Sequence, residues 1–283
     1  MIYNREKEAL EEDIQYGGKY LKFLYNNIFG RILLKIIISP VFSKIYGTYN
    51  SSSLSKRKIN KFIKKYKINI DEYEEKNYQS FNDFFIRRKK QVSFDNNLGT
   101  LISPADSKLL VYKITDGLKI KIKQSYYTLE ELLSEKKDLQ SFKNGSCLVF
   151  RLSMDDYHRY CHIDNGKIES VRKIKGKLHT VSSISNEYKV YSQNSRICNY
   201  ISTENLGNII YIEVGALLVG KINNDNKITF SKGDEKGYFE LGGSTIVVLT
   251  NNQIKIDDDI IKYSNKGIET KVKYGERIGG VKC

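Results

Sequence analysis

The stretch GYFELGGSTIVVL, residues Gly237 to Leu249, combines a glycine pair, a serine and a run of β-branched residues. Gly242 and Gly243 let the backbone take φ values that are closed to other residues. The Ile-Val-Val run that follows Ser244 favours a β-strand. The pattern predicts a bend that leads directly into a strand, with Ser244 at the joint. A plain glycine bend before a strand gives the same pattern.

A serine at this joint also suggests a reaction. If a nearby base removes the hydroxyl proton of Ser244, its oxygen can attack the carbonyl carbon of Gly243 and convert the peptide bond into an ester. Backbone strain at the glycine pair would favour this attack. Elimination across the serine Cα–Cβ bond would release Gly243 as a new C-terminus and leave dehydroalanine, which hydrolyses to a pyruvoyl group. The segment is therefore a candidate self-cleavage site.

After Lys90 the chain consists of short segments rich in β-branched residues with turn residues between them. This texture predicts a mostly antiparallel β core, interrupted by one helix at residues 128–135 (TLEELLSE). The predicted strands are LLVYKI (109–114), LKIKIK (118–123), SCLVFRLS (146–153), NIIYIEVGALLVGKI (208–222), KITFS (227–231), STIVVLT (244–250) and QIKIDDDII (253–261).

The first 90 residues predict helices instead. Apolar residues recur at three- and four-residue steps over residues 21–37, which places them on one face of a helix. That helix should end near Ser39 and Pro40. Further helices are expected over residues 55–66 and 77–88, the last with Ser80 as N-cap.

The expected fold class is α+β, with a helical N-terminal cap (residues 1–90) on a β-rich catalytic body (residues 91–283). Between Ile14 and Ile70 the chain has twelve Lys or Arg and no Asp or Glu. The first helix could be a core helix, and a Lys-rich composition accounts for part of the net charge of +14. An apolar face flanked only by cations favours a helix that lies in the interfacial plane of an anionic membrane.

The cysteines and the apolar runs indicate a reducing compartment and no membrane span. The four cysteines are widely spaced, form no C-x-x-C pair and follow a charged N-terminus without a cleavable signal pattern. The longest uncharged apolar run, residues 36–42, is far shorter than the ~20 residues needed to cross a bilayer. We therefore expect a peripheral protein on the cytoplasmic side of the cell membrane.

Five further motifs accompany the Gly-Gly-Ser-Thr segment. They are FNDFFIRR (81–88), SPAD (103–106), DYHR (156–159), VGALLVG (214–220) and KGDEKG (232–237). In this order and approximate spacing, over about 170 residues from Phe81 to Leu249, the chain resembles the phosphatidylserine decarboxylase family.

The resemblance implies a pyruvoyl-dependent carboxy-lyase of phospholipid biosynthesis, made as a zymogen. The precursor would cut itself at Gly243-Ser244 into a β chain (residues 1–243) and an α chain (residues 244–283). The pyruvoyl group formed from Ser244 would be the covalent cofactor and make a Schiff base with phosphatidylserine, which becomes phosphatidylethanolamine and carbon dioxide. No metal or diffusible cofactor is implied.

The resemblance also implies an Asp-His-Ser triad for self-cleavage. Asp106 matches the family's aspartate, and Ser244 matches the cleaved serine. The family usually reads Tyr-His-Arg-x-His, whereas here residues 157–160 are followed by Cys161 and then His162. Without a gap, the second histidine of the family falls on Cys161.

Two histidines therefore compete for the catalytic roles. If the segment is extended, His158 and His162 share a face, so either could reach the site. We assign His162 as the base for self-cleavage and His158 as acid or base in substrate turnover. A structural role for one of them stays open. His179 is a third candidate that could support the site.

Two other departures from the family affect local backbone shape and substrate contacts. The family often has Gly at the position of Ser107 and Glu at the position of Ser195, and neither change removes a proposed catalytic group. The implied chemistry needs an electron sink, a proton donor, for which His158 is best placed, and a site of low polarity. The basic stretch up to Lys67 suits an anionic lipid substrate, since each Lys or Arg near such a surface adds about 1 kcal/mol of attraction.

Two alternative functions remain. The same pyruvoyl chemistry could act on a soluble or nucleoside-linked amino acid, which the amphipathic basic helix argues against. A non-catalytic protein could bind nucleic acid through residues 56–67, but that segment has no known reader motif. The expected partners are thus phosphatidylserine in an anionic membrane and the paired α and β chains, with no nucleic acid. The sequence leaves open a homo-oligomer, the acyl-chain preference and the phosphate-binding residues.

Overall fold

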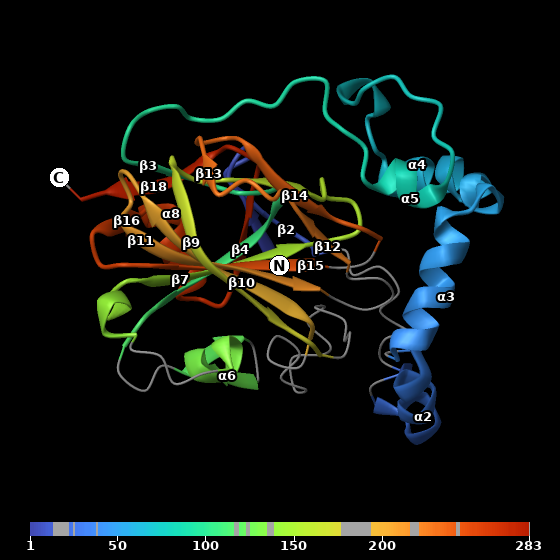
Figure 1. Ribbon diagram of the computed structural model, residues 1–283, viewed down its shortest axis with the longest axis horizontal. Helices are drawn as coiled ribbons and strands as arrows, with labels where there is room; N and C mark the ends of the chain where they lie inside the picture. The colour runs from blue at the N-terminus through green and yellow to red at the C-terminus, as the bar shows by residue number, and fades with distance from the viewer. Residues whose placement is uncertain are drawn as a thin grey trace.

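The computed structural model describes residues 1–13, 23–24, 26–37, 39–115, 119–122, 125–134, 139–176, 194–215, 221–241 and 244–282. Within them the protein is a mixed α+β structure, which confirms the predicted fold class. Figure 1 shows a β-rich body with the N-terminal helices along one side of it, and a long loop that joins the two.

A ten-stranded sheet forms the centre of the described body. Its neighbouring strands are antiparallel except for β1 and β17, which are parallel, so the predicted mostly antiparallel core is confirmed. In spatial order the strands are β13 (Thr229–Phe230), β9 (Gly166–Ile174), β10 (Arg196–Thr203), β11 (Asn208–Gly215), β15 (Ser244–Thr250), β7 (Ser146–Leu152), β4 (Ser107–Lys113), β17 (Glu269–Val272), β1 (Ile2–Asn4) and β2 (Ala9–Glu11).

β15 lies in the interior of this sheet, and all of its residues are buried. Ile246 and Val248 pack into the apolar cluster on one face of the sheet. Val247 and Leu249 pack into the cluster on the opposite face. Because both faces are covered, the strand is apolar on both sides and does not alternate with polar residues.

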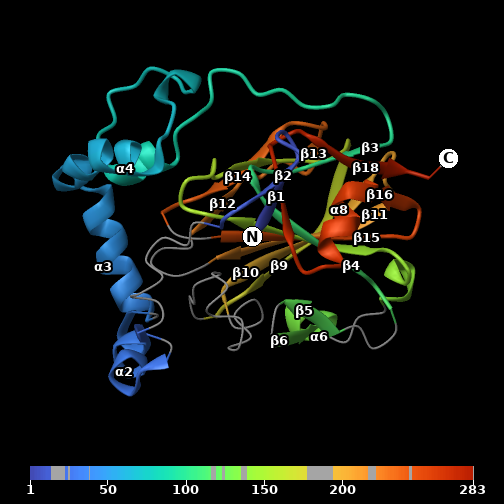
Figure 2. The same cartoon turned by 180° about the vertical axis from the view of Figure 1, so that it is seen from behind.

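Two layers cover the large sheet, as Figure 2 shows. One apolar cluster is completed by two three-stranded sheets and a helix, and the other by α6. One small sheet consists of β12 (Ile222–Asn224), β14 (Glu235–Phe239) and β8 (Arg159–Cys161), and the other of β16 (Ile254–Ile256), β18 (Arg277–Val281) and β3 (Thr100–Ile102). The helix on the same face is α8 (Asp258–Ser264). On the opposite face, α6 (Leu129–Leu133) lies near the hairpin of β5 (Lys119–Ile122) and β6 (Ser125–Thr128).

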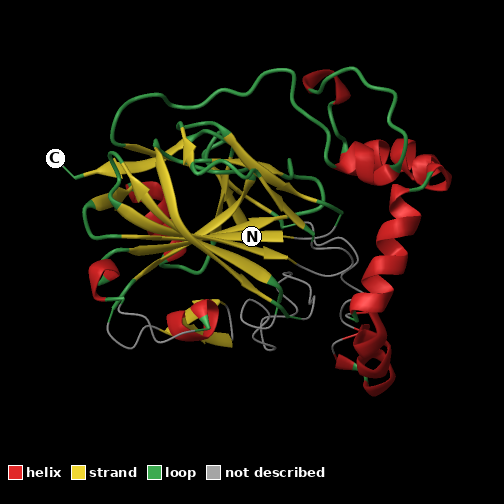
Figure 3. Ribbon diagram, viewed as in Figure 1, coloured by secondary structure: helices red, strands yellow, loops and turns green. Residues whose placement is uncertain are grey.

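In the helical region, where Figure 3 draws the helices in red, the described residues 28–51 form two helices, whereas the sequence predicted one helix that ends near Ser39. The first, α2 (Ile28–Ile37), ends before Ser39 as expected. The second, α3 (Pro40–Ser51), was not predicted, because a proline after an apolar run indicates the end of a helix as readily as the start of one. The hydroxyl of Ser39 accepts a hydrogen bond from the backbone of Phe42, and Pro40 occupies the first helical position. A capping serine followed by proline is a start signal that could have revealed α3.

The other two predicted helices are present but shorter. The 55–66 segment is the 3₁₀ helix η1 (Ser53–Lys58) followed by α4 (Ile59–Tyr66). The helix predicted over residues 77–88 is too long at both ends: α5 covers only Phe81–Phe85, and Ser80 caps it as predicted. Residues 88–90 leave the helical pattern because their backbone pairs with residues 72–74, at the end of the 3₁₀ turn η2 (Ile70–Glu72).

In the body, the helix predicted at residues 128–135 is confirmed as α6, which has a full capping box on Thr128. Residues 140–142 form the short 3₁₀ turn η3 (Gln140–Phe142). The predicted strand over residues 253–261 is correct only as far as Ile256. Its second half is helix α8, whose first turn contains Asp258 and Asp259. Acidic residues stabilise the N-terminal end of a helix, which explains the switch.

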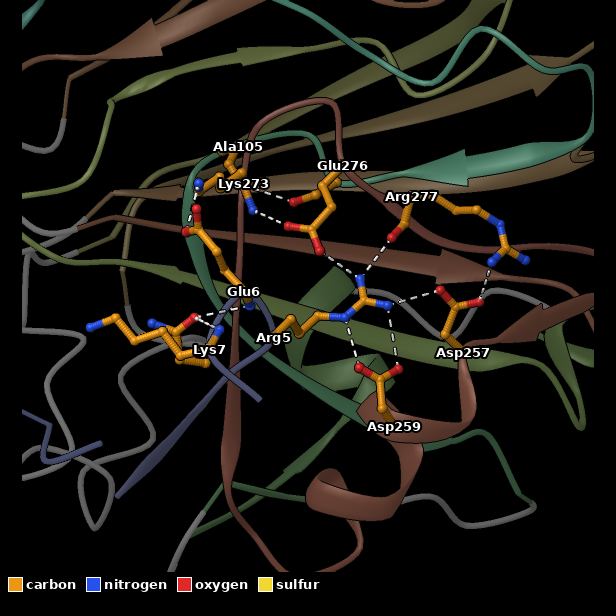
Figure 4. A network of polar contacts seen from close by, with 11 residues as sticks. Arg5, Glu6, Lys7, Ala105, Asp257, Asp259, Lys273, Glu276 and Arg277 are labelled. Atoms are coloured by element: carbon orange, nitrogen blue, oxygen red, sulfur yellow. Dashed lines mark hydrogen bonds and ion pairs between the residues drawn. The ribbon is translucent and has the colours of Figure 1, made fainter. Parts of the chain in front are cut away.

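The first residues of the chain belong to the edge of the large sheet, where β1 and β2 pair. Arg5 lies in the turn between them and forms ion pairs with Asp257, Asp259 and Glu276 (Figure 4). These contacts join the N-terminal end of the chain to its C-terminal segment. The division into regions 1–90 and 91–283 stays a prediction.

Candidate active site

Four neighbouring strands place candidate residues along one edge of the large sheet. This edge is formed by the ends of the strands and is not the edge strand pair of β1 and β2. β7 and β11 end at this edge, whereas β4 and β15 begin there. Ser244 pairs with Leu152 on one side and with Gly215 on the other. Asp106 directly precedes β4, which is two strands from β15. At about 4.8 Å per strand, Asp106 and Ser244 lie on the order of 10 Å apart along this edge.

Ser244 is the first residue of β15 and is fully buried. Its hydroxyl oxygen has no hydrogen-bond partner among the described residues. A buried hydroxyl without a partner costs free energy, because it has lost its bonds to water. Gly242 and Gly243, which precede it, lie outside the described residues.

His158 lies where β7 and β14 approach this edge. It follows the turn after β7, and its backbone oxygen accepts a hydrogen bond from Phe239, the last residue of β14. Its Nδ1 atom is 2.9 Å from the backbone oxygen of Asp156. A carbonyl oxygen only accepts, so in the neutral ring Nδ1 carries the hydrogen and Nε2 keeps the lone pair. The buried ring packs on Phe85, with 4.2 Å between ring centroids.

His162 lies beyond the other end of β8. Its ring stacks on Phe230 at a centroid distance of 3.5 Å, and its backbone N–H donates to Asp234. Burial, followed by the charges of Lys236 and Lys227, lowers the pKa of His162 to about 2. The imidazole therefore stays neutral and is a poor acceptor for a proton.

The extended β8 strand thus separates the two histidines. Four residues at about 3.3 Å each put them roughly 13 Å apart along the strand. His158 is at the end from which β14 leads toward Ser244, whereas His162 is at the end near β13. The division of roles between them stays a prediction.

Asp106 contacts a lysine and a backbone amide. Lys89 Nζ is 2.8 Å from one carboxylate oxygen, and the backbone N–H of Tyr274 donates to the other at 2.7 Å. Lys89 also lies over the ring of Tyr157, the neighbour of His158, at 4.9 Å. The sequence did not single out Lys89 or Tyr274, although Lys89 follows the FNDFFIRR motif directly.

The remaining sequence candidates form contacts with groups other than Ser244 or lie outside the described chain. Cys161 is fully buried in β8, and burial raises the pKa of its thiol to about 12, so it stays protonated at neutral pH. His179 lies outside the described residues. Ser107 donates to the backbone of Ala105, and Ser195 bonds to the backbone of Gly176.

A buried charged pair beside Ser244 was missed by the sequence. Glu213 on β11 and Lys236 on β14 form an ion pair in which both side chains are almost completely buried. Asn199 donates to the second carboxylate oxygen at 2.7 Å. Glu213 pairs with Ile246, two residues from Ser244 on the same face of the sheet. The signal was a single acid inside the apolar strand NIIYIEVG.

Comparison with known proteins agrees with the motif pattern. The family model described as phosphatidylserine decarboxylase matches residues 81–280. "Phosphatidylserine decarboxylase proenzyme 2" of Clostridium acetobutylicum is 53% identical over 98% of this chain and 97% of its own length. "Phosphatidylserine decarboxylase proenzyme" of Clostridium botulinum (strain Langeland) is 41% identical over 99% of each chain, and that of Clostridium kluyveri is 41% identical over 98% of this chain and 97% of its own.

Proposed function

The chain belongs to the phosphatidylserine decarboxylase family, and we propose that it converts phosphatidylserine into phosphatidylethanolamine and carbon dioxide after cutting itself before Ser244. The observation that carries the proposal is the fully buried Ser244 hydroxyl at the first residue of a central strand. The word "proenzyme" in the names of the relatives fits a chain that matures by cleavage.

A pyruvoyl group fits the position of Ser244. Conversion of the serine would remove a buried hydroxyl donor that has no partner among the described residues, and a keto oxygen has no hydrogen to donate. When formed, the group supplies a sink for the electrons that the departing carboxylate leaves behind. The apolar residues that surround this edge exclude water and favour loss of the substrate's charge.

The contacts of the two histidines support His158 for proton transfer from Ser244. A base that takes the hydroxyl proton becomes positively charged, and the surroundings of His162 oppose that charge. The Nδ1 contact of His158 leaves Nε2 as the basic atom of its neutral ring. We propose His158 for self-cleavage on this basis. Asp106 would act from the same sheet edge, held by Lys89 and Tyr274.

The α and β chains would stay together after the cut because their strands alternate in the sheets. β15 lies between β11 and β7, and β17 lies between β4 and β1, so each of these two α-chain strands has a β-chain strand on both sides. In a smaller sheet, the α-chain strand β18 also pairs with β3 of the β chain. The ion pairs of Arg5 add a further link between the two chains (Figure 4).

The test combines mass and activity. Purified protein should contain chains of 243 and 40 residues, the shorter one blocked at its N-terminus, and they should co-elute on gel filtration under native conditions. Incubation with phosphatidylserine vesicles should release carbon dioxide and phosphatidylethanolamine, measured by mass spectrometry of the lipids. A single intact chain that still decarboxylates phosphatidylserine would overturn the proposal.

We also propose that the helical region places the enzyme on the cytoplasmic face of the cell membrane. None of the described helices is long and apolar enough to cross a bilayer. α2 and α3 instead leave large apolar side chains in contact with water, and Ile28 and Phe29 are 72% and 73% exposed. A patch of this kind beside many cations is typical of a surface that docks on anionic lipid. The exposed residues are Phe23, Ile28, Phe29, Ile32, Leu33, Ile36, Val41 and Ile45.

Charges placed in this patch should release the protein from vesicles. We expect the double variant Phe29→Glu/Ile32→Glu to lower the partition coefficient on anionic vesicles at least about tenfold, because burying each apolar side chain is worth about 1.5–3 kcal/mol. Flotation with vesicles at low and high salt measures the effect. The control is Ile228→Glu, an equally exposed position on the body, which should bind as the wild type does. Equal binding of the double variant, or turnover of soluble serine derivatives without vesicles, would contradict membrane docking.

A further inference from the structure

The short helix α5 lies at the junction of the helical region and the candidate active site. Phe81, Phe84 and Phe85 are buried in an apolar cluster that also contains Phe62 of α4 and Leu241 of the body. The rings of Phe62 and Phe81 are 5.1 Å apart. α5 is therefore fixed on both sides, by a helix and by the segment that leads to Ser244.

One contact of α5 reaches the segment before the cleavage site. The backbone N–H of Leu241 donates to Oδ1 of Asn82 at 3.2 Å. Leu241 is buried, and only two residues separate it from Ser244, which is itself fixed by pairing with β7 and β11. The described residues on either side of the two glycines, Leu241 and Ser244, are thus both held in place.

A second contact reaches the histidine. The fully buried ring of Phe85 packs on the ring of His158 at 4.2 Å, tilted by 45°. Arg159, which follows His158 and begins β8, donates from Nε to the backbone oxygen of Ile86, which directly follows α5. The orientation of His158 is therefore set from the same helix that holds Leu241.

We propose that α5 is the positioning element for self-cleavage, with Asn82 fixing the segment that carries the scissile peptide and Phe85 fixing the ring of His158. The inference rests on the proposed self-cleavage at Ser244. The two residues between Leu241 and Ser244 are glycines, which lose more conformational freedom on ordering than any others. A hydrogen bond that fixes Leu241 reduces the entropy lost when the hydroxyl and the carbonyl carbon meet. Asn82 and Phe85 touch no reacting atom in this scheme.

The test compares two variants of Asn82, one without and one with a side-chain oxygen that can accept the hydrogen bond from Leu241. Asn82→Ala removes the acceptor and should slow self-cleavage about tenfold, the cost of one well-placed hydrogen bond in the transition state. Asn82→Asp keeps an acceptor oxygen and should restore cleavage to within about twofold of the wild type. Asp83→Asn is the control, because the described hydrogen bonds of the Asp83 side chain go to Lys76 and Gln79 and to neither Leu241 nor His158. The rate is measured as conversion of the 283-residue chain into two pieces after pulsed cell-free synthesis.

Stability is separated from positioning by repeating each variant on the uncut Ser244→Ala chain and comparing melting temperatures. Phe85→Leu serves as a second variant that keeps apolar packing but removes the ring against His158, and it should also slow cleavage. Wild-type cleavage rates in both Asn82→Ala and Phe85→Leu, or an Asn82→Asp chain as slow as Asn82→Ala at equal melting temperature, would overturn the inference alone. A wild-type chain that never cuts would overturn the proposed function and this inference with it.

Discussion

Ser244→Ala is expected to leave the protein as one uncut chain of 283 residues that forms no phosphatidylethanolamine. The substitution removes the hydroxyl that attacks the preceding carbonyl, and it also removes the atoms from which the pyruvoyl group is made. Because the hydroxyl has no partner among the described residues, its loss leaves no hydrogen-bonding group unsatisfied there. The variant should therefore fold at least as stably as the wild-type precursor. Denaturing gels, intact mass and a lipid assay measure the three expectations.

The neighbouring residue provides a matched control for Ser244. Thr245 is also fully buried, and its hydroxyl also has no hydrogen bond in the described structure. It points to the opposite face of the sheet, because side chains alternate along a strand. Thr245→Val should therefore cut and turn over as the wild type does. Ser244→Cys should cut slowly, since a thiol can make the same acyl shift. A Ser244→Ala chain that still cuts between residues 243 and 244 would contradict the scheme.

Local patterns in the sequence predicted the elements whose form depends on near neighbours. The β-branched run after Ser244 and the capping residues Thr128 and Ser80 specify their structures within a few positions of the chain. Long-range pairing decided the cases that failed. Residues 88–90 leave the helical pattern because their backbone pairs with residues 72–74. β1 joins the large sheet by pairing with β17, which is more than 260 residues away.

The candidate site likewise contains residues that the sequence predicted and contacts that it did not. The resemblance to a family pointed to Asp106 and Ser244, and both lie at one edge of the large sheet. The contacts of Asp106 with Lys89 and Tyr274 were not predictable, because they join separate segments of the chain. The contact of Asn82 with Leu241, near Ser244, was not predictable for the same reason. The spacing of the two histidines was visible in the sequence, but their surroundings were not. Residues that share a strand face can still lie at opposite ends of the strand.

His158→Gln is expected to slow self-cleavage at least about a hundredfold, whereas His162→Gln should cut within about threefold of the wild-type rate. A positioned general base typically contributes a factor of about 10² to 10⁴, and His158 is the histidine at the Ser244 end of β8. The assignment made from the sequence predicts the reverse, with the His162 variant uncut. One pair of proteins therefore decides between the two assignments.

The measurement is the rate at which newly made precursor is converted into its two chains, followed by the activity of whatever cleaved enzyme forms. Glutamine keeps much of the size and polarity of histidine but cannot take up a proton, so a lost rate reports the missing base. Each variant is also made on the Ser244→Ala chain, where a similar melting temperature shows that packing against Phe85 or Phe230 survives. An uncut His162→Gln chain beside a normally cut His158→Gln chain would restore the sequence assignment. Normal cutting by both would remove these two histidines from the reaction and leave His179 and Lys89, the cation next to Asp106, as the next groups to substitute.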